Sequence, residues 1–350
     1  MPKYSVIIPA YQCEKTIAST VRSVVTSGLT DLEVVIVDDG STDNTAAVCR
    51  ELCASFPFIR YFKQLNSGVS AARNCGIEHS TGEFVLFVDS DDTLIPFDPE
   101  LLEEYLTDVV DVLIFGMEFQ YWKNGICRRK DTLSCDRLMN LSAGEIGPVF
   151  GELFCCNYFS SSCNRIIRRS MLLEHNIRFD TRLINYEDLE FSVRIAAYSR
   201  NTVSVPDVHY VYYLTAGQDR TVERVKRIPN IVAAVDPIAD AMFLLNRRIR
   251  EVTGTDCQPL LEIALQIYMD MFICKMKTAT LQQVRQQCLY FKESENLKHC
   301  AAYFSKMSGV ARSVLMWIDR DDAARIWLYF RYRNLRNRSV RCVKSLIGKY

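Results

Sequence analysis

Two aspartates separated by one residue follow directly on a short apolar segment. Residues 84–88 read Phe-Val-Leu-Phe-Val, and Asp89-Ser90-Asp91-Asp92 comes next. The apolar segment is typical of a fully buried strand, so the acids must lie where that strand ends. In an extended chain, side chains two residues apart point to the same side, which brings the carboxylates of Asp89 and Asp91 together.

Carboxylates this close repel each other unless a cation or a hydrogen-bond donor lies between them. Mg²⁺ and Mn²⁺ prefer oxygen ligands and commonly keep places for substrate phosphates. The stretch therefore indicates a divalent-metal site. An acidic turn after a strand is the alternative, because Asp and Ser favour turns in any protein.

Two more apolar segments also end in polar residues. Residues 4–8 lead to Tyr11, and residues 33–37 lead to Asp38 and Asp39. In an open parallel sheet, ligands bind in the crevice at the carboxyl ends of the strands. Acids that follow separate strands would then face one cleft, which favours a ligand site over unrelated acidic turns. Within this pair, we assign a binding role to Asp39 and a structural role to Asp38.

A third acidic pair, Glu187-Asp188, stands at the start of a helical pattern. Leu189, Val193 and Ala197 recur on one helix face directly after it. Acids are favoured in the first turn of any helix, so the pair has an ordinary explanation as well as a catalytic one.

The predicted elements around these residues alternate between strands and helices. After the first strand, apolar residues recur at helical spacing as far as Gly28. The next expected elements are a strand over 33–37, a helix ending at Pro57, a strand over 58–62, a helix over 71–78 and the strand over 84–88. This βαβαβαβ order requires a mostly parallel sheet with helices on both faces, as in a Rossmann-like α/β fold.

The second half of the chain gives fewer signals. A strand is expected over 109–115, a polar span over 121–140, and a helix around 171–173 after residues 161–169. Strands are expected over 203–205 and 208–213, around Pro206. From residue 230 onward the pattern is helical, as in Leu260, Ala264, Ile267 and Met271.

A dinucleotide-binding Rossmann site is the obvious rival. That site needs Gly-x-Gly-x-x-Gly directly after the first strand. Here the corresponding residues are Pro9-Ala10-Tyr11-Gln12-Cys13-Glu14, without a glycine. The sequence therefore excludes that cofactor site.

The composition is that of an ordinary globular protein. Of the 350 residues, 49% are hydrophobic and 24% are charged, and the formal net charge is zero. A neutral chain has no general attraction to nucleic acid, so no such partner is expected.

The 14 Cys show no metal-ligand spacing, and we find no signal peptide and no apolar stretch long enough to span a membrane. We therefore expect a cytoplasmic protein with reduced thiols.

Five blocks of the sequence occur in an order that is known from one enzyme family. They are residues 5–11, 35–43 and 66–74, residues 88–92 with an Asp-x-Asp motif, and residues 187–191 with an acidic motif. Together they resemble an inverting, family 2 glycosyltransferase with the A-type fold, over a match from about Tyr4 to Tyr213. Gln12 departs from the family pattern, which commonly has Asn there.

The resemblance implies a nucleotide-sugar donor and a hydroxyl acceptor. Asp39 would accept a hydrogen bond from the nucleobase edge, Tyr11 would pack on the base, and Arg73 would lie near the nucleotide. Asp89 would face the ribose. The remaining candidates for nucleotide-sugar binding are Pro9, Glu14, Asn66, Gly68 and Ser90. A UDP-sugar is the favoured donor.

The resemblance also implies Mn²⁺ or Mg²⁺, held by Asp91 and bridging the diphosphate. Breaking the glycosyl phosphate bond leaves a nucleoside diphosphate, whose developing charge a Lewis acid stabilises. Asp188, with Glu187 beside it, would accept the proton of the acceptor hydroxyl in one in-line displacement. Such a displacement inverts the anomeric carbon.

We expect two parts in the chain, a nucleotide-sugar-binding and catalytic domain over 1–228 and a helical region over 229–350. The tail from Arg325 to Tyr350 carries eight basic side chains and no acid. With its apolar residues, it suits binding to an anionic surface at the inner face of the cell membrane, where lipid-linked saccharide acceptors would lie. A helix packed on its own domain, or a dimer contact, is the alternative.

Two other functions have less support from the sequence. A sugar-phosphate nucleotidyltransferase would have a Gly-, Lys- and Arg-rich phosphate loop where this chain has Gln12-Cys13-Glu14. A non-catalytic receiver domain or membrane-docked scaffold would leave Glu187 and Asp188 without a role. We therefore favour a glycosyltransferase that transfers sugar to a glycan or lipid-linked acceptor in cell-surface polysaccharide synthesis.

Overall fold

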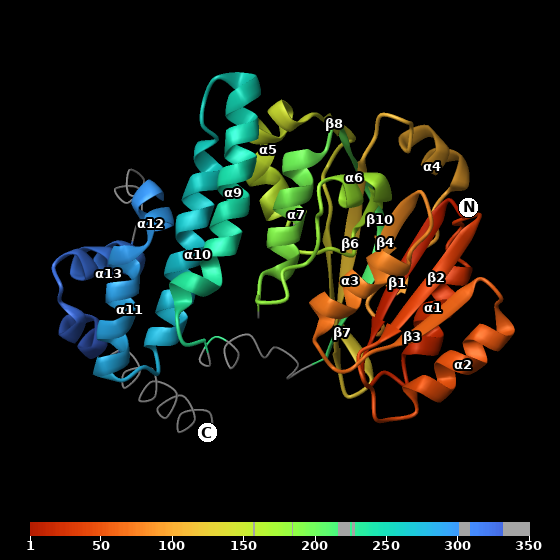
Figure 1. The fold of residues 1–350 in the computed structure, drawn as a ribbon, viewed down its shortest axis with the longest axis horizontal. Helices are drawn as coiled ribbons and strands as arrows, with labels where there is room; N and C mark the ends of the chain where they lie inside the picture. The colour runs from red at the N-terminus through yellow and green to blue at the C-terminus, as the bar shows by residue number, and fades with distance from the viewer. Residues whose placement is uncertain (157, 184, 216–224, 226–227, 301–308, 332–350) are drawn as a thin grey trace, which may run out of the picture. The chain divides into compact units, whose positions relative to one another are not determined.

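The computed structural model describes residues 1–156, 158–183, 185–215, 225, 228–300 and 309–331 (Figure 1). The chain forms two compact units. The first comprises Met1–Gln218 and Leu244–Cys257, and the second comprises Asp219–Phe243 and Gln258–Tyr350. The expected functional division into residues 1–228 and 229–350 stays a prediction.

The first unit is built on one ten-stranded sheet in the order β3-β2-β1-β4-β9-β6-β10-β5, with β7 paired to β6 and β8 paired to β10. The strands are β1 (Tyr4–Ala10), β2 (Leu32–Asp38), β3 (Ile59–Lys63), β4 (Phe84–Phe87), β5 (Thr93–Leu94), β6 (Val112–Lys123), β7 (Ile126–Leu133), β8 (Met139–Leu141), β9 (Arg165–Arg168) and β10 (Thr202–Thr215). The expected mostly parallel α/β sheet is confirmed.

The parallel half of the sheet follows the expected βαβαβαβ order. Strand β1 pairs in parallel with both β2 and β4, and β2 pairs in parallel with β3. The crossover helices are α1 (Ile17–Val25), α2 (Thr45–Ser55) and α3 (Val69–His79). Strands β1, β2 and β4 are almost wholly buried, as their continuous apolar sequences predict.

Two parts of the sheet differ from the sequence expectation. Residues 161–169 were expected only to lead to a helix, but 165–168 form β9, antiparallel to both β4 and β6. This strand has only four residues, with Arg at both ends, so its sequence shows no alternation of apolar and polar residues from which a strand could be predicted. The polar span over 121–140 contains the end of β6 and all of β7, joined by Asn124-Gly125 with φ values of 54° and 74°.

Helices complete both units. In the first unit they include α4 (Pro99–Tyr105), α5 (Ala143–Cys155), α6 (Arg169–Glu174) and α7 (Glu187–Tyr198). The later helices are α9 (Ile231–Thr253), α10 (Gln258–Met276), α11 (Leu281–Glu293), α12 (Glu295–Cys300) and α13 (Gly309–Asp319). The helical C-terminal region is therefore confirmed, and Leu260, Ala264, Ile267 and Met271 are buried as their spacing predicts.

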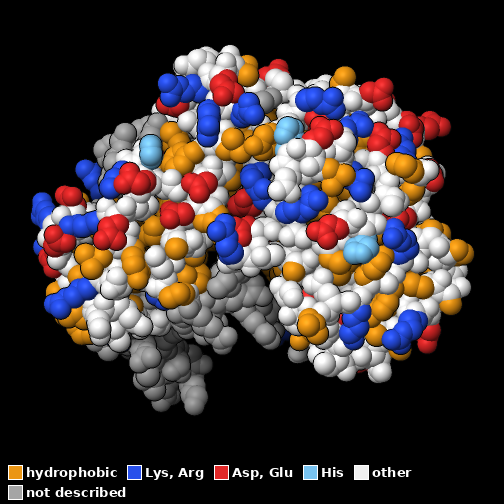
Figure 2. Space-filling view, viewed as in Figure 1, with side chains coloured by type: hydrophobic (Ala, Val, Ile, Leu, Met, Phe, Trp, Pro, Cys, Tyr) orange, Lys and Arg blue, Asp and Glu red, His pale blue; other side chains and the backbone are white. Residues whose placement is uncertain are grey.

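The basic tail falls mainly on residues 332–350, which lie outside the described residues. In its described part, Ile326 and Phe330 are buried, and the Arg325 guanidinium lies 5.7 Å from the ring centre of Trp317. None of the described helices combines the length and the apolar character needed to cross a bilayer. On the face drawn in Figure 2, acidic and basic side chains are interspersed, in keeping with the zero net charge.

The packing of α3 on β1 generates a stability prediction. A Cβ added at Gly76 would lie 2.2 Å from Cγ2 of the buried Ile7. Gly76→Ala should therefore overpack the core and lower the free energy of unfolding by about 1–3 kcal/mol. Gly151→Ala, in α5, is the matched control, because nothing lies within 4 Å of its added Cβ. Urea denaturation followed by circular dichroism measures both, and equal midpoints for Gly76→Ala and the wild type would contradict the packing.

Candidate active site

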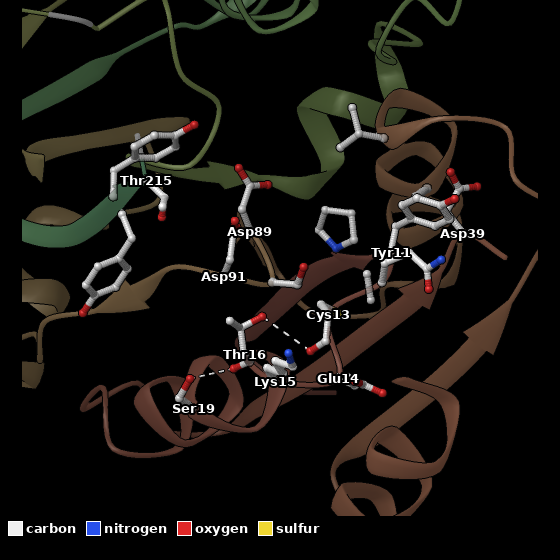
Figure 3. Close-up of a pocket in the computed structure, with 18 of the residues that line it drawn as sticks. Tyr11, Cys13, Glu14, Lys15, Thr16, Ser19, Asp39, Asp89, Asp91 and Thr215 are labelled. Carbon is white, nitrogen blue, oxygen red and sulfur yellow. Dashed lines mark hydrogen bonds between the residues drawn. The ribbon is translucent and has the colours of Figure 1, made fainter. Parts of the chain in front are cut away.

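One pocket of about 1200 Å³ lies at the carboxyl ends of β1, β2 and β4. All twelve residues that the sequence analysis singled out line it: Pro9, Tyr11, Glu14, Asp39, Asn66, Gly68, Arg73, Asp89, Ser90, Asp91, Glu187 and Asp188. In Figure 3, Tyr11 and Asp39 lie at one end, Thr215 at the other, and Asp89 and Asp91 between them. The structure therefore brings the candidates together, while their individual roles stay predictions.

Asp39 fixes one wall of the pocket. The Asp39 N–H donates to the carbonyl of Ala10 at 2.8 Å, which joins the ends of β1 and β2. The Asp39 carboxylate accepts hydrogen bonds of 2.8 Å from the Gln64 side chain and from the backbone N–H groups of Ser67 and Gly68. Because these three donors hold it, this buried carboxylate orders the segment that leads into α3.

A positive φ favours glycine at two positions in this wall, and at Gly40 a close backbone approach adds to it. Gly40 has a φ of 78°, and a Cβ there would lie 2.9 Å from the backbone N of Asn66. Gly68 has a φ of 91° and directly precedes α3. Both conformations favour glycine, so the segment around Asn66 can approach the end of β2.

Gln12 and Glu14 tie the β1 loop to the start of α2. The Gln12 side-chain oxygen accepts from the N–H groups of Thr42 and Asp43, at 3.2 and 3.1 Å. The Glu14 carboxylate accepts from the N–H of Asn44 at 2.9 Å. Gln12 has a φ of 52°, a left-handed conformation that Asn tolerates better, which gives a physical reason for the Asn that the family commonly has there.

Tyr210 anchors the turn from Asp89 to Asp92. Its hydroxyl accepts from the N–H of Asp89 at 3.1 Å and donates to the Asp92 carboxylate at 2.7 Å. Asp92 also accepts from the N–H of Tyr213 at 3.0 Å. Burial, together with the negative charge of Asp89, raises the pKa of Asp92. Asp92 is therefore a buried anchor that attaches this turn to β10.

Asp91 differs from its neighbour because no other described residue forms a hydrogen bond or ion pair with its carboxylate. Its side chain is open to solvent but lies in a concave wall, where surrounding protein atoms and the charge of Asp89 raise the pKa of Asp91. A cation would relieve this repulsion, so the residues fit a metal ion. No group of three or more His, Cys, Asp or Glu in the described chain is arranged to hold one. In proteins, Mg²⁺ usually keeps several waters and substrate phosphates among its ligands.

Arg73 lies between two of the candidate carboxylates. Its Nη1 donates to Asp188 and its Nη2 donates to Asp89, both at 2.9 Å. Only 4% of the Arg73 side chain is exposed. Burial opposes its charge, but the negative charges of Asp188 and Asp89 outweigh burial and raise the pKa of Arg73.

Glu187 and Asp188 form the first turn of α7. Tyr186, just before them, has a φ of 65°, a strained conformation for a bulky residue, and it turns the chain into the helix. The Asp188 side chain is one-quarter exposed. It therefore faces the pocket while it remains paired with Arg73.

Several pocket residues were not found from the sequence. They are Lys15, Thr16, Ser19, Trp122, Asn124, Gly125 and Thr215. The Asn124-Gly125 dipeptide is a strong hairpin signal that was present in the sequence. Nothing in the sequence places that hairpin at this pocket, because β6 and β10 meet only in the folded sheet.

Comparison with known proteins now identifies the domain. Residues 5–175 match the family model described as Glycosyl transferase family 2. The chain carries a family 2 glycosyltransferase domain. It is 30% identical over 216 residues to the uncharacterized glycosyltransferase YibD of Escherichia coli (strain K12), a match that covers 61% of each protein. It is 41% identical over 110 residues to a chondroitin synthase of Escherichia coli, over 31% of this chain and 16% of that one.

The glycosyltransferase fold also occurs in a solved structure. TarS 1-349 of S. aureus in complex with UDP-GlcNAc is 19% identical, with a TM-score of 0.53, over 87% of this chain and 92% of that chain. This likeness supports the A-type fold. The sequence match spans about three fifths of the length of YibD and less than a fifth of the chondroitin synthase.

The Tyr210 anchor generates a second prediction. Tyr210→Phe should keep the fully buried ring but leave the N–H of Asp89 and the carboxylate of Asp92 without this partner. We expect the free energy of unfolding to fall by about 1–3 kcal/mol. Tyr11→Phe, at a residue that is 51% exposed, should leave it unchanged. Denaturation of both variants measures the difference, and unaltered stability of Tyr210→Phe would contradict the anchor.

Proposed function

We propose that this chain is a metal-dependent, inverting glycosyltransferase. It moves a sugar from a nucleoside-diphosphate donor, preferably a UDP-sugar, to a hydroxyl of a glycan or lipid-linked acceptor. The observation that carries the proposal is that all twelve candidate residues share one pocket, and ten of them lie within residues 5–175, which match the family 2 glycosyltransferase model.

The Tyr11 and Asp39 end of the pocket receives the nucleoside. Tyr11 offers an exposed aromatic face for the base, and the Asp39 carboxylate is fixed by its three donors. Asp89 lies between this end of the pocket and Thr215 (Figure 3). Its proposed partner is the ribose. Pro9, Glu14, Asn66, Gly68 and Ser90 complete this part of the wall. The UDP-GlcNAc complex of TarS supports UDP as the first donor base to test.

Charge makes a cation necessary for such a donor. Seven carboxylates and two basic side chains line the described pocket: Glu14, Asp39, Asp43, Asp89, Asp91, Glu187 and Asp188, against Lys15 and Arg73. A diphosphate that enters this surface alone would be repelled. Mn²⁺ or Mg²⁺ held by Asp91 would offset that repulsion and act as a Lewis acid on the leaving diphosphate.

Asp188 is the proposed base. Its carboxylate accepts the proton of the acceptor hydroxyl as the oxygen attacks the anomeric carbon, and the nucleoside diphosphate leaves on the opposite side. Glu187 precedes it in the same helical turn. A single displacement of this kind inverts the anomeric configuration.

The acceptor is a saccharide of a cell-surface polysaccharide, free or lipid-linked. The partial match to a chondroitin synthase supports a glycan acceptor. The basic tail from Arg325 to Tyr350 would hold the enzyme at an anionic membrane, where a lipid-linked acceptor lies.

Donor binding provides the third prediction. UDP with Mn²⁺ at about 100 times its dissociation constant should raise the melting temperature by on the order of 5 °C, because it binds only the folded protein. Asp91→Asn should lose the Mn²⁺-dependent part of this rise. Asp131→Asn, which removes a carboxylate paired with Arg129 outside the pocket, is the control and should keep it. A thermal-shift series with UDP, GDP, Mn²⁺ and Mg²⁺ measures this, and no response to any of them would refute the proposed function.

Transfer provides the fourth prediction. Asp188→Asn should keep the UDP-induced thermal shift but slow UDP release from UDP-GlcNAc by about 10²–10⁴-fold, because the attacking hydroxyl loses its proton acceptor. Asp180→Asn removes a carboxylate that pairs with Arg182 and does not line the pocket, and it should leave turnover unchanged. Normal turnover by Asp188→Asn would move the base to another residue.

A further inference from the structure

Arg73 is a buried cation whose charged groups are directed at carboxylates from two distant parts of the chain. Asp89 follows β4, and Asp188 lies 115 residues after Arg73 in the first turn of α7. Each receives one hydrogen bond of 2.9 Å from a separate Nη atom. The Nε of Arg73 has no hydrogen-bond partner in the described structure.

The planar guanidinium sets directions as well as charge. A guanidinium holds its N–H groups in a rigid fork, so two carboxylates that bond to different Nη atoms are fixed relative to each other. A Lys ammonium is a point charge on a flexible stem and cannot impose this geometry. The Arg73 fork therefore orients the Asp188 carboxylate with respect to Asp89.

The ion pair between Arg73 and Asp188 is one connection between α3 and α7, and a second connection involves Phe179, just before α7. The Arg73 guanidinium lies 5.1 Å from the ring centre of Phe179. Asn74 donates to the carbonyl of Phe179 and accepts from its N–H, both at 2.8 Å. The Phe179 ring stacks on Phe191 of α7 at 3.9 Å and 12°. Successive residues of α3 thus hold both Asp188 and the segment before α7.

We propose that Arg73 is a positioning residue that holds Asp188 ready to accept the acceptor's proton, through an ion pair shared with Asp89. This inference rests on the proposed glycosyltransferase function. It replaces the direct nucleotide contact that the family resemblance implied for Arg73, because both Nη atoms are already used by carboxylates.

The positioning has a clear chemical purpose. Small displacements of a reacting group cost large factors in rate, so a base held before the acceptor arrives needs no reorganisation during the reaction. Without Arg73, Asp188 and Asp89 would face each other as like charges and move apart. The ion pair also links the donor side of the pocket to the acceptor side.

Arg73→Lys tests the proposal as the fifth prediction, because it keeps the charge and removes the fork. We expect kcat for UDP release from UDP-GlcNAc to fall by about 10²-fold, the cost of misplacing a reacting group. The UDP dissociation constant with Mn²⁺ should change by less than about threefold, since Arg73 does not bind the donor. Arg60→Lys is the matched control and should behave as the wild type, because Arg60 pairs with Glu33 outside the pocket.

A double-mutant cycle separates positioning from general structural damage. If Arg73 acts through Asp188, adding Arg73→Lys to Asp188→Asn should slow turnover by less than about twofold more. Multiplied losses, or a loss of UDP affinity equal to the loss of kcat, would overturn the proposal. Arg73→Gln, which keeps a planar N–H donor and removes the charge, replaces Arg73→Lys if that variant does not fold. A wild-type chain that binds neither UDP nor GDP, with Mn²⁺ or Mg²⁺ present, would instead refute the proposed function.

Discussion

The pocket depends on one charge arrangement, a guanidinium held between two carboxylates. Asp89 follows β4 and Asp188 lies in the first turn of α7, and both would repel a diphosphate and each other. Arg73 neutralises part of this charge and fixes the distance between them. Its burial is tolerated because the two carboxylates compensate its charge.

The aspartates of the pocket differ in their hydrogen-bond partners, and these partners give them different roles. The carboxylates of Asp39 and Asp92 accept hydrogen bonds from backbone N–H groups and from side chains of the protein. These two residues therefore shape the walls of the pocket. Within the described residues Asp91 has no such partner, and it is the carboxylate that we propose to hold a cation. Asp188 lies between these cases, because Arg73 holds it while a quarter of its side chain faces the pocket. Anchoring residues therefore surround the residues proposed to do chemistry.

The sequence predicts the parts of this arrangement that depend on local order. A buried strand followed by Asp89 and Asp91, and the parallel order that places Asp39 near them, are readable because strand ends meet at one edge of a sheet. The partner of Arg73 is not readable, because Asp188 lies 115 residues away and the pairing exists only in the fold. Strand β9 escaped prediction because a four-residue segment has too few positions to show a period. The Asn124-Gly125 hairpin was readable, but its place over the pocket was not.

The most direct test of the central claim is a crystal structure of the protein with UDP and Mn²⁺, in which anomalous scattering locates the metal. We expect a manganese peak that joins the Asp91 carboxylate to the diphosphate, with the Arg73 guanidinium still paired to Asp188 and Asp89. A metal bound elsewhere, or an Arg73 side chain turned onto the diphosphate with Asp188 released, would contradict it.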